Sequence, residues 1–232
     1  MSRHTDAYSK FLIQAGETEI LRKSASKLER NSPIINGDKI NALCRGAIVL
    51  LSSSLEAYIK GLGESLLDKL YTKNITRKSI NSQLFYHISK DIIKSIQEST
   101  DPEVIADKIF NFIDRDACFW SKDGHFNKPI PTDIFNYGFS NPAFKKIQKY
   151  FNRFGYVEYK NDLRKNLTTD YWHITNTVDH LVAIRNSIAH GDPYAAKTPS
   201  ELHELALAIK HFCKSTDDVF SSWCKLTYCT IR

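Results

Sequence analysis

Residues 183–193 read AIRNSIAHGDP, and this stretch joins the end of a regular helix to a strong stop signal. Upstream of the stop, apolar residues recur every three or four positions, which marks the side of a helix that faces a core. These residues are Ile174, Val178, Leu181, Ile184 and Ile188. The Gly-Asp-Pro sequence at 191–193 predicts that the helix, which opens near Tyr171, ends at about His190.

The same helix carries a second face of small and polar residues. At about 100° per residue, one line along the helix, roughly opposite the apolar side, holds Asp179, Ala183, Asn186 and His190. Arg185 lies at the edge of the apolar side. Because the second face lacks apolar bulk, we expect it to meet another helix or a substrate.

Arg185 and His190 combine a permanent charge with a proton-transfer group. The planar guanidinium suits a phosphate or a pentacoordinate phosphorus centre. The imidazole titrates near neutral pH, and the C-terminal end of a helix favours its protonated form. Together they suit cleavage of RNA by its own 2′-hydroxyl without a metal ion. The alternative is structural: Arg185 pairs with an acid of a neighbouring helix and His190 caps its own helix.

The segment 185–190, RNSIAH, resembles the R-N-x-x-x-H form of the R-x(4–6)-H motif of the HEPN superfamily, with the glycine that usually follows the histidine. The segment 50–60, LLSSSLEAYIK, is similar to the second helix of the stand-alone bacterial branch that includes the RiboL-PSP-type HEPN proteins. The middle of the chain resembles no family that we can name.

The resemblance implies a homodimer with a composite active site and a metal-independent endoribonuclease of the toxin–antitoxin or antiphage defence type. It implies that His190 is the general acid/base, that Arg185 stabilises a phosphorane-like transition state and that Asn186 orients the scissile phosphate or the imidazole. The products would be a 2′,3′-cyclic phosphate and a 5′-hydroxyl. RNA and an antitoxin or regulatory protein are the expected partners, and no cofactor is expected.

Amphipathic patterns predict an all-α fold with four long helices, at about 6–30, 39–71 and 171–190 and from Thr198 onward. The up-down bundle arrangement comes from the HEPN resemblance. Residues 34–38 are expected to connect the first two helices, and Gly61 and Gly63 permit close helix approach. Glu56, the one acid in the most apolar section of the second helix, has two interpretations. It is either an ordinary helix-surface charge or a supporting residue that holds Arg185 or His190.

Residues of about 73–167 are predicted to form a helical insertion between the second and third long helices of one domain, 1–232. Helices are expected around 79–99 and 101–114, the latter opened by Asp101-Pro102-Glu103. Residues 121–142 read as a loop, after which Asn141-Pro142 starts a short helix.

This short helix begins the main candidate RNA-binding segment outside the motif. Its cations include Lys145, Lys146, Lys149 and Arg153. Aromatic rings lie among them, at Phe144, Tyr150, Phe151, Phe154, Tyr156 and Tyr159. Cations attract the phosphate backbone, and exposed rings stack on unpaired bases. The alternative is that the rings form a local core while the lysines face solvent, which we expect for most of the rings.

Composition narrows the class of protein. The net charge of +6 suits a polyanionic partner without requiring one. Five cysteines with no C-x-x-C pair argue against a disulfide framework, and neither zinc-ligand spacing nor a cluster of acids for two metal ions appears. No apolar run approaches the ~20 residues of a membrane span, and no signal-peptide core is present. We therefore expect a cytoplasmic protein with no metal and no membrane partner.

Two alternatives to catalysis remain. In the first, the chain is a non-catalytic interaction module whose motif stabilises a dimer, so that replacing His190 changes no activity. In the second, it is an RNA-binding module, so that binding falls when Lys145, Lys146 and Lys149 are removed and depends little on His190.

Overall fold

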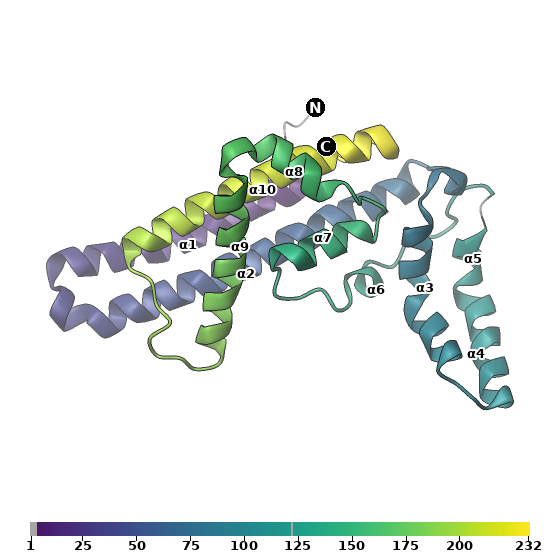
Figure 1. The fold of residues 1–232 in the computed structure, drawn as a ribbon, viewed down its shortest axis with the longest axis horizontal. Helices are drawn as coiled ribbons and strands as arrows, with labels where there is room; N and C mark the ends of the chain where they lie inside the picture. The colour runs from purple at the N-terminus through teal and green to yellow at the C-terminus, as the bar shows by residue number, and fades with distance from the viewer. Residues whose placement is uncertain (1–3, 122) are drawn as a thin grey trace.

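The structure, a computed structural model, describes residues 4–121 and 123–232. All regular elements within these residues are helices, which confirms the all-α prediction. Three long helices run along the longest axis of the molecule, and a fourth crosses them (Figure 1). The three are α1 (Asp6–Asn31), α2 (Pro33–Thr72) and α10 (Pro199–Thr227), and the crossing helix is α9 (Tyr171–Ala189).

Helix α2 lies at the centre of the core. Leu51, Leu55, Ile59, Leu62 and Leu66 are fully buried, and α2 contacts α1, α9 and α10. Removing this much apolar surface from water is the largest favourable contribution to folding. An 18-residue window of α2 has a mean hydropathy of 1.3, so by length and composition alone it could cross a membrane. Half of that window is buried inside the protein, and packing in the bundle accounts for its apolar character.

The predicted connection at 34–38 is wrong, because α2 begins at Pro33 and only Ser32 separates it from α1. Proline fits the first turn of a helix, where its missing N–H has no partner to lose. Ile34 and Ile35 belong to this turn and are exposed. The Asn-Gly-Asp sequence at 36–38 therefore continues a helix, although its composition is typical of a turn.

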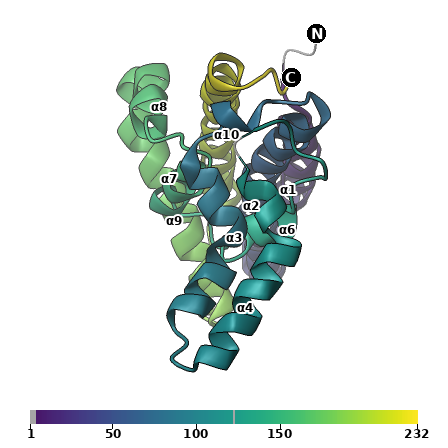
Figure 2. The same ribbon diagram turned by 90° about the vertical axis from the view of Figure 1, so that its right-hand side faces the viewer.

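The first part of the predicted insertion forms an arm, which we define as residues 77–120. It comprises η1 (Arg77–Ser79), α3 (Ser82–Gln97), α4 (Pro102–Arg115) and α5 (Ala117–Trp120). Figures 1 and 2 show α3 and α4 side by side, projecting from the long helices. The Asp101 carboxylate accepts a hydrogen bond of 2.9 Å from the Glu103 N–H, which confirms the predicted start of α4.

The second part of the insertion belongs to the main body. It comprises α6 (Thr132–Asn136), α7 (Phe144–Asn152), α8 (Tyr159–Leu167) and η2 (Thr168–Asp170). The predicted loop at 121–142 thus contains a short helix, and α7 begins at Phe144 rather than at Asn141. Helix α7 contacts α9, while α8 contacts α9 and α10. Gly155, with φ of +88°, lies in the turn that separates α7 from α8.

The aromatic rings of 144–159 form a local core, as expected for most of them. All six are buried, and the ring centroids of Phe151 and Phe220 lie 4.7 Å apart. The rings of Tyr150 and Phe154 reach α2 at Gly63, so this glycine admits side chains rather than the backbone of a second helix. A Cβ at Gly63 would lie 2.2 Å from the Tyr150 hydroxyl and 2.8 Å from Cζ of Phe154.

Replacing Gly63 by alanine is therefore expected to destabilise the protein. Overpacking of this kind costs about 1–3 kcal/mol, because the rings must move. Gly37→Ala in the same helix is the matched control, since a Cβ there meets nothing within 4 Å. It should stabilise the protein by roughly 0.5–1 kcal/mol through helix propensity. Urea unfolding followed by circular dichroism measures both, and a Gly63→Ala variant as stable as the parent would contradict this packing.

Candidate functional site

Helix α9 ends in a fixed turn that displays His190. His190 occupies the C-cap position, and Gly191 follows with φ of +84°, a conformation that glycine adopts without strain. The Gly191 N–H donates to the Ile188 carbonyl at 3.1 Å, and the Asp192 N–H donates to the Ser187 carbonyl at 3.0 Å. This pair of bonds is a Schellman motif. It ends the helix where the sequence predicts and leaves His190 exposed.

Arg185 and Asn186 are half-buried beside this turn. A guanidinium N–H of Arg185 donates to Oδ1 of Asn186 at 3.3 Å, and the Asn186 amide nitrogen forms no hydrogen bond within residues 4–121 and 123–232. The Asn186 carbonyl accepts from the His190 backbone N–H at 2.9 Å. Ala183, on the same face of α9, is exposed. The motif therefore lies on an open surface that a substrate or a second protein surface can reach.

Arg45 of α2 also reaches the motif turn. Its Nη1 donates to the Asp192 carbonyl at 2.6 Å, and its side chain is half-buried. This bond ties the turn after His190 to the central helix and brings another guanidinium close to the motif. The sequence does not reveal Arg45, because 147 residues separate it from Asp192. Its only sequence signal is a charge close to the apolar section of α2.

The Glu56 carboxylate forms its hydrogen bonds with residues outside the motif. Its Oε1 accepts from Lys60 Nζ at 2.7 Å, and its Oε2 accepts from the Asn141 N–H at 3.0 Å. Glu56 thus anchors the segment that leads into α7. These contacts do not bring it to Arg185 or His190, so its role in supporting them stays a prediction.

The four predicted RNA-binding cations divide into two kinds. Lys145, Lys146 and Lys149 are exposed on α7, and Lys146 Nζ donates to the Ser140 carbonyl at 3.0 Å. Arg153 is half-buried, and its Nη1 donates to the carbonyls of Phe135 at 2.5 Å and Tyr137 at 3.3 Å. Burial lowers the pKa of Arg153 below its ordinary value. Arg153 therefore holds α6 against α7, whereas the three lysines are available to a ligand.

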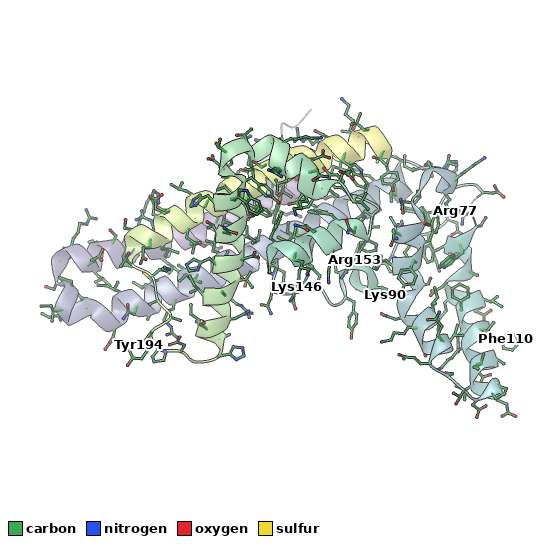
Figure 3. The ribbon with its side chains drawn as sticks, viewed as in Figure 1. Arg77, Lys90, Phe110, Lys146, Arg153 and Tyr194 are labelled. Carbon is green, nitrogen blue, oxygen red and sulfur yellow. The ribbon has the colours of Figure 1, made fainter. Side chains whose placement is uncertain are left out.

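Helix α7 starts on the same face of α9 that carries the motif. Asp179 Oδ1 accepts from the Phe144 N–H at 2.7 Å, which satisfies a free donor at the N-terminus of α7. His190 lies eleven residues after Asp179, or roughly 16 Å along the helix. Figure 3 shows Lys146 on the side of the molecule toward which α9 ends. Lys146 and the C-terminal end of α9 thus lie on one side of the protein.

One group of side chains offers donors of the kind that hold a metal ion. His4, Asp217 and Asp218 have ligand atoms within 4.8 Å of one another. Asp217 is fully buried, and it accepts hydrogen bonds from the Thr5 side chain and, at 3.3 Å, from the Thr5 N–H. Burial raises the pKa of Asp217, while Arg232 donates to Asp218 at 2.7 Å. The guanidinium balances the acidic charge, so these contacts suit a structural clasp between the two chain ends.

His87 of α3 has a pKa well below the ordinary value of a histidine. Its burial, with smaller contributions from Arg153 and Lys90, lowers this pKa from 6.5 to about 4. Between these values the unfolded chain binds a proton that the folded chain does not, so the free energy of unfolding falls as the pH falls. The free energy of unfolding of the protein therefore depends on pH through His87.

We expect the wild type to lose stability relative to His87→Phe as the pH drops from 6.5 toward 4. Urea unfolding at a series of pH values measures the difference. His211→Phe, at an exposed position of α10, is the control for the exchange of a histidine that is not buried. A pH-independent difference in stability between His87→Phe and the wild type would contradict the low pKa of His87.

Arg45→Met is expected to loosen the turn after His190. It keeps the apolar stem and removes a charged hydrogen bond, whose contribution is about 1.5–3 kcal/mol. Hydrogen exchange of residues 187–193, measured by mass spectrometry, should become faster by roughly tenfold or more. Arg30→Met, at the exposed end of α1, is the control and should leave this segment unchanged. Unchanged exchange in Arg45→Met would show that the bond to Asp192 does not hold the turn.

Comparison with known families gives one match. The model of the RiboL-PSP-HEPN family matches residues 16–222. No curated protein and no solved structure matches the chain. The matched range runs from α1 to α10 and contains the motif turn, Arg45 and all of α7.

Proposed function

Because the chain belongs to the RiboL-PSP-HEPN family, we propose that it is a metal-independent endoribonuclease built on Arg185, Asn186 and His190. HEPN domains commonly form dimers and bind RNA. The observation that carries the proposal is the exposed imidazole at the end of α9, one helical turn after Asn186, whose side chain accepts a hydrogen bond from the half-buried Arg185 guanidinium. The predicted catalytic residues thus share one accessible surface.

The proposed reaction is a transesterification within RNA. The His190 imidazole takes the proton of a 2′-hydroxyl, and that oxygen bonds to phosphorus while the bond to the 5′-oxygen breaks. The leaving oxygen takes a proton from an imidazolium, which gives a 2′,3′-cyclic phosphate and a 5′-hydroxyl. Arg185 and the Asn186 amide donate to the phosphoryl oxygens, where negative charge builds up in the transition state.

A homodimer is part of the proposal. Because the motif lies on an open surface, one copy supplies only one wall of a site. A two-fold axis beside α9 would bring the motif of a second copy opposite the first. One imidazole could then act as the base and the other as the acid. A cytoplasmic location, a role as a toxin or in antiphage defence, and control by an antitoxin or regulator follow from the family resemblance and belong to the proposal.

The lysines of α7 extend the proposed RNA contact. Lys145, Lys146 and Lys149 are exposed, and α7 starts at the upstream end of the motif face. Phosphates of an RNA strand would contact these lysines on the way to His190. Arg45 would act as a positioning residue, because it holds the turn that carries the imidazole. A non-catalytic RNA-binding module is the second candidate, and the same exposed lysines favour it.

Cleavage of a mixed RNA pool in EDTA tests the proposal. His190→Ala and Arg185→Ala should each reduce the rate by about 10²-fold or more, since both groups act in the transition state. His180→Ala, an exposed histidine of the same helix, is the matched control and should cleave like the wild type. Circular dichroism and sedimentation would first establish that each variant folds and associates as the parent does.

The chemical ends of the RNA fragments and the effect of replacing the lysines distinguish an endoribonuclease from an RNA-binding module. Wild-type fragments should end in a 2′,3′-cyclic phosphate, detected by mass spectrometry. Replacing Lys145, Lys146 and Lys149 by alanine should weaken RNA binding and its salt dependence. Equal background cleavage by the wild type and both motif variants would overturn the catalytic proposal. If the lysines still governed binding in that case, the chain would be an RNA-binding module.

A further inference from the structure

Helix α4 leaves an apolar strip uncovered on the outside of the arm. Phe110 is 65% exposed, Ile113 54% and Ile109 41%, and Ala106 on the same side is exposed too. Among the described residues, α4 buries none of its side chains. Its main packing partners are α3 and α5. Figure 3 shows Phe110 at the edge of the arm that faces away from the main body. The protein's own helices therefore leave the strip open.

A row of acids borders this strip. At about 100° per residue, Glu103, Asp107 and Asp114 lie next to one another along α4, beside Phe110. All three are exposed. Their carboxylates form no hydrogen bond or ion pair within residues 4–121 and 123–232. The charge along this border is therefore available to a ligand.

Helix α3 covers the opposite border of the strip. Lys108 turns toward it, and its Nζ donates to the Ser95 carbonyl at 3.0 Å. Phe112 is half-buried on the same side. Helices α3 and α4 thus cover each other on one side only. A third helix packed against the strip would complete a small three-helix layer.

The charge pattern decides what kind of helix fits. Two antiparallel copies of α4 packed strip to strip would bring exposed carboxylates toward one another, and like charges oppose such a contact. A helix with lysine or arginine along its edge would pair with Glu103, Asp107 and Asp114 instead. We propose that the outer face of α4 is a docking site for a basic amphipathic helix of another protein, with apolar residues at helical spacing.

This docking site stands apart from the proposed RNase site. It lies on the arm, whereas the motif lies on α9 and the exposed lysines on α7. Neither α7 nor α9 is among the main packing partners of α4. The proposal rests on the strip and its acidic border and does not depend on RNA cleavage. A protein bound there would leave His190 accessible.

The test uses the full chain and two synthetic peptides. One is a fluorescein-labelled amphipathic helix of leucine, alanine and lysine, and the other carries glutamate in place of every lysine. In fluorescence anisotropy the lysine peptide should bind at least about tenfold more tightly than the glutamate peptide, because only it complements the acids. Phe110→Ser with Ile113→Ser should weaken that binding by about tenfold or more.

Three further variants locate the contact. Glu103→Lys, Asp107→Lys and Asp114→Lys together should reverse the preference, so that the glutamate peptide binds more tightly. Leu226→Ser, at an 87% exposed position outside the arm, should bind like the wild type. His190→Ala should also bind normally, which separates this result from the RNase test. Because reversal is a gain of binding, a mere loss of folded protein does not account for it.

Three outcomes would overturn the proposal. The first is no binding, or equal binding, of the two peptides. The second is unchanged binding by the variant that carries Phe110→Ser and Ile113→Ser. The third is that sedimentation shows the wild type as a dimer and this double variant as a folded monomer, since the strip would then be covered by a second copy.

Discussion

Helix α2 carries apolar side chains around so much of its circumference that several partners are needed to cover it. α1, α9 and α10 all contact it, and the Tyr58 hydroxyl donates to the Cys213 carbonyl of α10 at 2.7 Å. Gly63 of the same helix admits Tyr150, and Arg45 reaches the turn after His190. One continuous helix thus sets the positions of the aromatic core, α10 and the motif turn relative to one another. The geometry of the candidate site depends on the burial of α2, although α2 contributes no motif residue.

Local signals in the sequence predict where several helices begin and end. Gly191 predicts the end of α9, and it supplies the left-handed residue of the Schellman motif. Thr198 and Glu201 predict the start of α10, and the structure shows a reciprocal capping box between them. In both cases the hydrogen bonds join residues only a few positions apart. The sequence therefore contains all of the groups that decide the outcome.

The prediction at 34–38 was wrong because composition competed there with packing. Asn36, Gly37 and Asp38 are typical of turns, yet each can be accommodated in a helix at a cost of about 1 kcal/mol or less relative to alanine. The neighbouring turns of α2 bury Ile40 and Cys44, and this packing outweighs the weak local preference. The candidate site shows the same limit. The sequence places Arg185 and His190 at a helix end. Arg45 lies 147 residues from Asp192, and Glu56 lies 85 residues from Asn141, so these two contacts can be found only in the folded chain.

The net charge of +6 averages over surfaces of opposite sign. α7 presents Lys145, Lys146 and Lys149 and contains no acid, whereas α4 presents Glu103, Asp107 and Asp114. Exposed charges act over about 8 Å at physiological ionic strength, so each surface governs its own neighbourhood. A polyanion is attracted along α7 toward the end of α9 and is repelled by the outer face of the arm. Uncharged apolar surface on α4 would bind partners without regard to their charge. The acidic border instead favours basic partners at the arm. The two surfaces can be occupied at the same time because α4 and α7 are not among each other's main packing partners.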